Sequence, residues 1–112
     1  MGNSLRVNNR DILLENNGYL ASIDDWNHDV ALAFAQLENI ELTDKHWEVI
    51  HFVREFYIKY DTSPAIRALV KTMKESFGPE IGNSRYLHRL FPDGPAKIAT
   101  KIAGLPKPAK CL

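Results

Sequence analysis

The sequence predicts a mainly α fold: a small orthogonal helical bundle with a helix-turn-helix-like core, an N-terminal β-hairpin and a flexible C-terminal arm. Three observations lead to this prediction. Apolar residues recur at helical spacing through most of the chain, an alternating segment with a turn opens it, and two prolines spaced by one residue exclude a helix at its end. A chain of 112 residues fits a single domain. We expect this domain to span residues 1–104 and a mobile arm to span residues 105–112.

The N-terminal hairpin is predicted from alternation and turn chemistry. Residues 4–7 alternate polar and apolar side chains, and Asn8-Asn9-Arg10 then turns the chain into an apolar segment at residues 11–14. Asn17-Gly18 indicates a further turn. These signals are typical of a short two-stranded sheet.

Helices are predicted from apolar spacing, capping residues and breakers. We expect them at residues 27–39, 43–60, 63–77, 84–91 and 96–103. Thr43 is suited to cap the second helix, and Ser63 with Pro64 to form the N-cap and first position of the third. Gly104 fits the position just after the last helix, where the backbone commonly turns left-handed.

Charge and composition exclude several classes of protein. The net charge is zero, but residues 1–61 hold 5 Lys and Arg against 11 Asp and Glu, whereas residues 62–112 hold 9 against 3. The basic half could face an anionic partner, or the two halves could simply attract each other.

The longest apolar run has six residues, too few to cross a membrane, and the N-terminus lacks a secretory apolar region. We therefore expect a soluble, cytoplasmic and monomeric chain.

Cys111 is the main candidate for chemistry. It is the only cysteine, so an intramolecular disulfide and a cysteine zinc cluster are impossible. It stands one residue from the chain end, after two prolines, where we expect it to be exposed and able to enter another protein's site. Lys107 and Lys110 favour its nucleophilic thiolate, whereas the terminal carboxylate opposes it. The alternative is an incidental cysteine on a frayed tail.

The histidines give little support to a metal or acyl-transfer site. They are His28, His46, His51 and His88, and no two of them have the spacing of a zinc motif. We expect His46 and His51 to be partly exposed helix residues. A pair of Cys111 with His88 would need a fixed cleft, which a mobile arm does not provide. We expect neither a metal nor another cofactor.

A DNA-binding regulator is the alternative from a different class. The third and fourth predicted helices, joined by a Gly/Pro turn, resemble a helix-turn-helix, and Arg85 and Arg89 lie on one face of the second of them. This interpretation would place Asn83 and both arginines near phosphates or bases. The same arginines could instead receive an anionic partner or the chain's own arm.

Several motifs together resemble one known family. They are His46–Ile50, Phe52–Tyr57, Ser63–Arg67, Gly82–Leu87, Gly94–Lys97 and the closing run at residues 103–112. The closing run, Ala-Gly-Leu-Pro-Lys-Pro-Ala-Lys-Cys-Leu, is the most specific of them. The chain resembles the DsrC/TusE family over nearly its whole length. The resemblance implies a small helical domain with an arm whose penultimate cysteine carries sulfur as a persulfide.

The resemblance also implies a branch of the family. Members in dissimilatory sulfur metabolism carry a second cysteine ten residues before the penultimate one, and this chain has Lys101 there. It is therefore similar to the tRNA-thiolation branch. That branch is implied to be a sulfurtransferase that accepts sulfur from a TusBCD-type complex and passes it to an MnmA-type enzyme, which makes 2-thiouridine at the tRNA wobble position. A role in sulfur oxidation or reduction is the alternative within the family.

The basic half suits a relay protein, because cations can dock a partner and stabilise an anionic persulfide. The candidates are Arg85, Arg89, Lys97, Lys101, Lys107 and Lys110. For each residue alone, a solvated side chain without a partner is an equally good interpretation.

Overall fold

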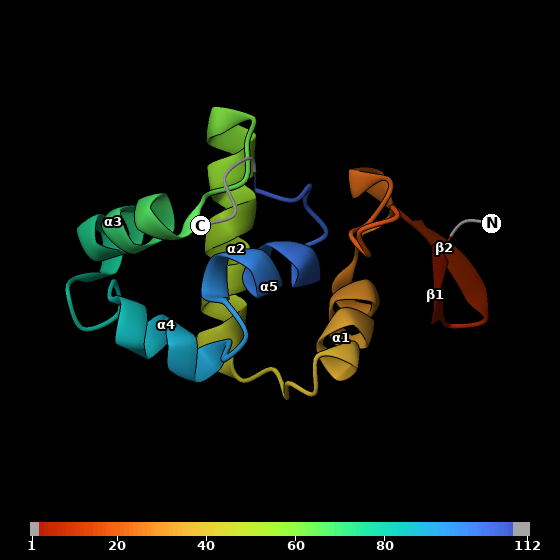
Figure 1. Cartoon of the computed structure of the whole chain (residues 1–112), viewed down its shortest axis with the longest axis horizontal. Helices are drawn as coiled ribbons and strands as arrows, with labels where there is room; N and C mark the ends of the chain where they lie inside the picture. Colours follow the sequence, from red (N-terminus) through yellow and green to blue (C-terminus); the bar gives the residue numbers. More distant parts are fainter. Residues whose placement is uncertain (1–2, 109–112) are drawn as a thin grey trace.

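The computed structural model describes residues 3–108. Within them, the chain forms two strands, one short 3-10 helix and five α-helices (Figure 1). Their bounds are β1 Asn3–Val7, β2 Arg10–Leu14, η1 Ile23–Asp25, α1 His28–Leu37, α2 Asp44–Tyr60, α3 Ile66–Phe77, α4 Ser84–Leu90 and α5 Pro95–Ile102. The prediction of a mainly α bundle with an N-terminal hairpin is confirmed, whereas the 3-10 helix was not predicted.

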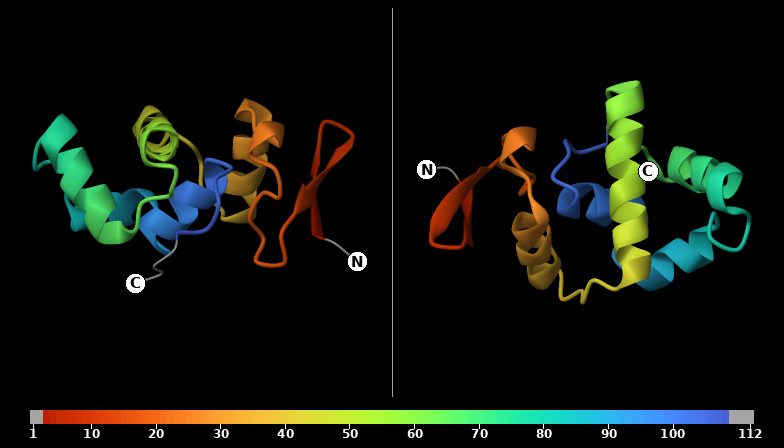
Figure 2. Two further views of the ribbon diagram at one scale, coloured as in Figure 1. Left: turned by 90° about the horizontal axis from the view of Figure 1, so that it is seen from above. Right: turned by 180° about the vertical axis from the view of Figure 1, so that it is seen from behind.

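The hairpin is closed by a two-residue turn. β1 and β2 are antiparallel, and Val7 lies opposite Arg10. Asn8 and Asn9 have φ angles of 50° and 66°, the left-handed conformation that asparagine tolerates and that tight hairpins require. The Asn8 amide donates a 2.8 Å hydrogen bond to the Asp29 carboxylate at the start of α1. The hairpin is therefore fixed against α1, at one end of the molecule (Figure 2).

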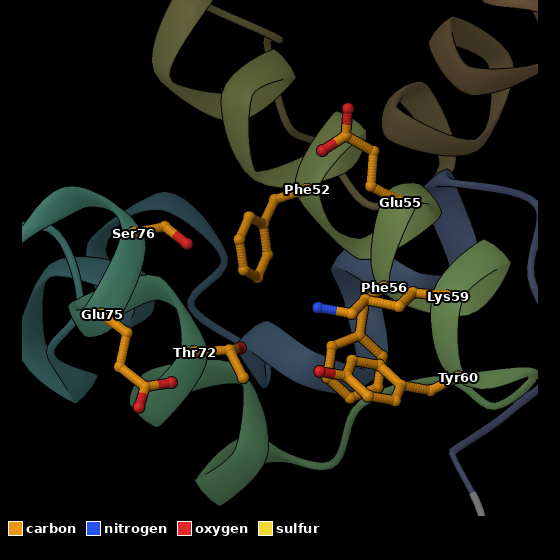
Figure 3. Close-up of a pocket in the computed structure, with 8 residues that line it drawn as sticks. All are labelled: Phe52, Glu55, Phe56, Lys59, Tyr60, Thr72, Glu75 and Ser76. Atoms are coloured by element: carbon orange, nitrogen blue, oxygen red, sulfur yellow. The ribbon is translucent and has the colours of Figure 1, made fainter.

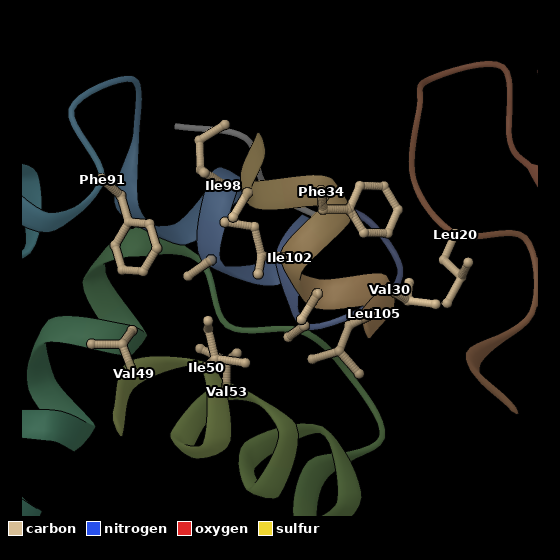
Figure 4. Packing of buried hydrophobic residues seen from close by; sticks show 14 of the residues in the cluster. Leu20, Val30, Phe34, Val49, Ile50, Val53, Phe91, Ile98, Ile102 and Leu105 are labelled. Atoms are coloured by element: carbon tan, nitrogen blue, oxygen red, sulfur yellow. The ribbon is translucent and has the colours of Figure 1, made fainter. Parts of the chain in front are cut away.

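Helix α5 lies at the centre of the bundle. It contacts α1, α2, α3 and α4, and most of its residues are buried. Ile102 of α5, Phe34 of α1 and Val53 of α2 belong to one apolar core (Figure 4). Four helices pack on α5, so contacts with all of them fix where the C-terminal end of α5 lies in the domain.

Helix α3 begins later than predicted. Its N-cap is Ala65, which makes no side-chain capping bond, and the prediction that Ser63 caps the helix is wrong. Ser63 is 7% exposed, and its hydroxyl donates a 2.6 Å hydrogen bond to the carbonyl of Pro106 instead. A residue before a proline favours an extended backbone rather than the start of a helix. The Ser63 hydroxyl therefore bonds a residue distant in sequence instead of capping α3.

The turn between α3 and α4 has the close approach of a helix-turn-helix. Gly82 is buried there, and a Cβ at this position would overlap the backbone of Lys74. Asn83 caps α4, because its side-chain oxygen accepts a 2.7 Å hydrogen bond from the Tyr86 N–H. Its amide also donates to the Pro79 carbonyl at 2.8 Å. Asn83, a candidate for DNA contact, is thus engaged within the turn.

His46 is buried rather than partly exposed, which corrects the expectation from sequence. It is 8% exposed, and its Nδ1 accepts a 3.1 Å hydrogen bond from the Thr43 N–H in a capping box. With that nitrogen an acceptor, Nε2 carries the proton and donates to the Leu90 carbonyl at 2.8 Å. The imidazole therefore joins the start of α2 to the end of α4. His51, in contrast, is exposed as predicted.

Candidate functional site at the root of the C-terminal segment

The end of α5 has the hydrogen bonds of a Schellman motif. Gly104 has a φ of +71°, and its N–H donates to the Lys101 carbonyl at 3.1 Å. The Leu105 N–H donates to the Thr100 carbonyl, also at 3.1 Å, and the Leu105 side chain is 1% exposed. The prediction for Gly104 is confirmed. The C-terminal segment therefore leaves α5 in a fixed direction.

Two side chains complete the cap of α5. The indole N–H of Trp26 donates a 2.8 Å hydrogen bond to the Ile102 carbonyl, and Arg54 Nη1 donates a 2.6 Å hydrogen bond to the Ala103 carbonyl. The Arg54 guanidinium carbon also lies 3.9 Å from the centre of the Trp26 ring. A Cβ on Gly104 would overlap this indole. Trp26 thus lies against both Arg54 and Gly104 at the C-terminal end of α5.

The charge of Arg54 suits its position. The C-terminal end of a helix carries partial negative charge, so a guanidinium there is favourable. Partial burial lowers the pKa of Arg54 from its ordinary value, although a guanidinium stays protonated in proteins. Trp26 and Arg54 were not among the residues predicted from the sequence. Gly104 was the only local signal near them, because both side chains come from distant parts of the chain.

The segment after α5 stays against the domain. Leu105 is buried, the Pro106 carbonyl accepts the hydrogen bond from Ser63, and Pro108 is buried. The predicted arm, residues 105–112, therefore begins with residues that contact the domain. Residues 109–112, which include Lys110 and Cys111, lie outside the described residues.

A cavity of about 350 Å³ borders this segment. Its lining includes Glu15, Tyr19, Tyr57, Gly104, Pro106 and Lys107. Tyr19 and Tyr57 give it aromatic walls, and the exposed Lys107 adds a cation near the exit of the chain. Among the predicted cations within residues 3–108, Lys107 is the one that lines this cavity.

Lys101 is held within the domain. Its ammonium lies 3.3 Å from the Glu38 carboxylate, and the two side chains are 18% and 19% exposed. The ammonium is also 5.9 Å from the centre of the Tyr19 ring. The charge of Lys101 is therefore largely used to join α5 to the end of α1.

Arg85 and Arg89 lie away from the root of the C-terminal segment. Both are exposed on α4, whose end is bonded to His46 at the start of α2. Arg54 lies in the second half of α2 and Ser63 lies beyond its end. Helix α4 lies beside the start of α2 (Figure 1), and a helix of 17 residues is about 25 Å long. The structure therefore does not bring these arginines together with Lys107.

A second cavity, of about 260 Å³, lies between α2 and α3 (Figure 3). Phe52, Phe56 and Tyr60 of α2 face Thr72 and Glu75 of α3 across it. Tyr57 lines the first cavity, so the two cavities use different faces of α2.

The described residues hold neither a metal cluster nor a membrane span. Within residues 3–108, no group of three or more His, Cys, Asp and Glu side chains could hold a metal ion. No helix in that range is long and apolar enough to cross a membrane.

Comparisons with known proteins agree with this architecture. The NMR structure of Allochromatium vinosum DsrC is similar over 100% of both chains, with a TM-score of 0.89 and 44% sequence identity. The oxidized γ-subunit of the dissimilatory sulfite reductase (DsrC) from Archaeoglobus fulgidus is similar over 98% of this chain and 100% of that chain, with a TM-score of 0.82 and 39% identity.

Sequence comparisons lead to the same family. A protein described as "Sulfurtransferase TusE homolog" from Haemophilus influenzae is 63% identical over 108 residues, covering 96% of this chain and 99% of that protein. "Sulfurtransferase TusE" from Salmonella choleraesuis is 60% identical over 103 residues, covering 92% and 94%. The sequence model of the family "DsrC like protein" matches residues 6–112. The chain therefore belongs to the DsrC/TusE family.

Proposed function

We propose that this chain is a sulfurtransferase that relays sulfur as a persulfide on Cys111. The high identity to proteins named sulfurtransferase TusE supports a sulfur-relay role. The observation that carries the assignment to Cys111 is that the chain has one cysteine, five residues after Pro106 in the sequence, and that the Pro106 carbonyl is bonded to the domain. A relay protein needs one accessible sulfur close to a surface that partners can approach.

The identity of residue 101 supports the single-thiol branch of the family. Lys101 stands ten residues before Cys111, where the resemblance places the second cysteine of the sulfur-metabolism members. Its ammonium is paired with Glu38 inside the domain. A chain with one thiol forms no intramolecular disulfide or trisulfide, so sulfur on Cys111 cannot pass to a second thiol of the same chain.

The proposed transfer is an exchange between sulfur atoms. The Cys111 thiolate attacks the outer sulfur of a donor persulfide, a new S–S bond forms, and the old S–S bond breaks. The donor leaves as a thiolate, and the outer sulfur keeps its proton in Cys111–S–SH. One persulfide and one thiolate are consumed and formed, so no external oxidant or reductant is needed.

The partners that best fit this role are those implied by the family. We propose a TusBCD-type complex as the donor and an MnmA-type enzyme as the acceptor, for 2-thiolation of the tRNA wobble uridine. The TusE name of the relatives supports this choice. Activation of the uridine and use of ATP then belong to the acceptor.

The test is intact-mass spectrometry of the wild-type chain and a Cys111→Ser variant. Each is incubated with a persulfide-charged cysteine desulfurase and the TusBCD-type complex. We expect a gain of one sulfur atom, reversed by a thiol reductant, on the wild type alone. Equal labelling of Cys111→Ser, or no labelling of either protein, would contradict the proposal.

A sulfur carrier in oxidation or reduction is the second candidate, because the solved structures similar in fold include the γ-subunit of a dissimilatory sulfite reductase. It predicts uptake of sulfur from a dissimilatory sulfite reductase instead of the TusBCD-type complex. A DNA-binding regulator predicts salt-dependent DNA binding that weakens in Arg85→Ala and Arg89→Ala. Cys111→Ser would leave that binding intact.

A further inference from the structure

The second half of α2 and helix α3 leave an aromatic cavity between them. Both helices pack on α5, and they are not closely packed against each other. Phe52, Phe56 and Tyr60 of α2 line the cavity, whose volume is about 260 Å³ (Figure 3). Tyr60 is 51% exposed, so this aromatic surface is open to water. The volume is below the roughly 300–1,000 Å³ of small-molecule sites, and it suits one inserted side chain.

The cavity already contains a cation of the chain itself. Lys59 lines it, and the Lys59 ammonium lies 5.2 Å from the centre of the Tyr60 ring. The face of an aromatic ring carries partial negative charge and attracts a cation placed over it. Lys59 is exposed and has no ion-pair partner among residues 3–108. The aromatic wall of the cavity is therefore suited to a cation.

Two carboxylates add negative charge on opposite sides of the cavity. Glu55 comes from α2 and Glu75 from α3, and both side chains are exposed (Figure 3). Neither glutamate forms an ion pair with another residue in the part of the chain that the structure describes. Two carboxylates against the one ammonium of Lys59 leave the lining with a net charge of −1. The cavity therefore combines aromatic rings with carboxylates that lack a cation.

We propose that this cavity receives an arginine side chain of a partner protein in the sulfur relay. A guanidinium is planar and stacks on aromatic rings, and its fork of N–H donors pairs with carboxylates. The apolar stem of an arginine packs on rings such as Phe52 and Phe56 while its charged end stays near water. Arginine is also enriched in protein interfaces. That the partner belongs to the relay rests on the proposed function, whereas the binding of arginine by the cavity does not.

The probe for the cavity is the peptide acetyl-Gly-Arg-Gly-amide, titrated into the full chain and followed by NMR chemical shifts. A peptide with citrulline in place of arginine is the control ligand, because it has nearly the same shape without the charge. We expect the arginine peptide to cause saturable shifts at the residues that line the cavity. The citrulline peptide should bind about 5-fold more weakly.

Variants of the lining test the contribution of each charge. Glu55→Gln and Glu75→Gln each remove one carboxylate and keep the shape of the side chain, and each should weaken binding of the arginine peptide about 2-fold to 5-fold. Lys59→Met removes the competing cation and should strengthen binding. Glu80→Gln is the matched control, because it makes the same change of charge at an exposed glutamate outside the cavity. It should bind the peptide like the wild type.

The docking role is measured in sulfur transfer. Half-saturating concentrations are determined for uptake from the TusBCD-type complex and for delivery to the MnmA-type enzyme. Glu55→Gln and Glu75→Gln should each raise this concentration about 2-fold to 5-fold with at least one of the two partners. The rate constant of transfer within the complex should stay unchanged, and Glu80→Gln should behave like the wild type.

The outcomes separate this proposal from the relay function. Equal binding of the two peptides, or shifts that do not saturate at the lining residues, would overturn it. Half-saturating concentrations at the wild-type value in both variants, with both partners, would also overturn it and leave the relay intact. Failure of the wild type to take up sulfur would contradict the relay function itself, and saturable binding of the arginine peptide would then still support the cavity as an arginine site.

Discussion

Lys101 is paired with Glu38 across 3.3 Å, with less than a fifth of either side chain exposed. The pair joins the last turn of α5 to the residue after α1. Breaking it leaves a carboxylate that is poorly hydrated and has lost its cation.

Lys101→Ala is therefore expected to destabilise the domain. Removal of one partner from a fully buried pair costs about 3–5 kcal/mol, and residual contact with water reduces the expected cost here to about 1–2 kcal/mol. Lys97→Ala, on an exposed position of the same helix, is the control and should change stability by less than about 0.5 kcal/mol. Urea denaturation measures both. Equal midpoints for the two variants would show that the ion pair does not stabilise the fold.

Gly104→Ala is expected to cost more stability than a left-handed backbone alone explains. A methyl group at this position overlaps the Trp26 indole and has to displace it from the Ile102 carbonyl. We expect a loss of about 2–4 kcal/mol, from backbone strain together with the displaced indole. Tryptophan fluorescence during denaturation reports both effects.

Gly78→Ala is the control for backbone strain. Gly78 has a φ of +92°, but nothing lies within 4 Å of a Cβ there. Its loss of stability should be the smaller of the two, about 1–2 kcal/mol. If the two alanine variants were equally stable, the contact of Gly104 with Trp26 would have no energetic role.

His46→Phe should destabilise the contact between α2 and α4. The variant leaves the Thr43 N–H and the Leu90 carbonyl without their bonds to the imidazole. Unmade bonds to partly buried backbone groups cost about 1–3 kcal/mol in total. His51→Ala, exposed on the same helix, should stay close to the wild type. Thermal unfolding of both proteins tests the difference, and a His46→Phe midpoint at the wild-type value would refute it.

Lys107 is expected to matter more for sulfur transfer than the arginines of α4. Lys107 lies at the root of the C-terminal segment, whereas Arg89 lies near the opposite end of α2. Reversal of a charge beside a docking surface changes association several-fold at low ionic strength, roughly 3-fold to 10-fold. Lys107→Glu should therefore slow sulfur uptake, and Arg89→Glu should not. Initial rates at low and high salt measure this, and a larger effect of Arg89→Glu would place the docking surface on α4.

Features with a local cause were predictable from the sequence. Asn8 and Asn9 specify a tight hairpin turn, and Gly104 specifies the left-handed end of α5, because backbone conformation there depends on the residue itself. Cys111 is likewise a candidate for chemistry from the sequence alone, because the closing run at residues 103–112 resembles that of the family.

Features that join distant segments were not predictable. Ser63 has the local signature of a helix cap, yet its hydroxyl bonds Pro106, 43 residues away. Arg54 and Ala103 are 49 residues apart, and His46 and Leu90 are 44 apart. The spacing of residues within one helix does not indicate such pairs, because their members come together only when the other helices pack around α5.

The chain after α5 is held to the domain through its main chain. Trp26, Arg54 and Ser63 all donate to main-chain carbonyls, which every amino acid provides. These hydrogen bonds therefore do not depend on which side chains the segment carries, whereas Gly104 and Leu105 are restricted by their packing. Variation in residues 104 and 105 is thus restricted by packing against the domain, and not by the hydrogen bonds that hold the main chain.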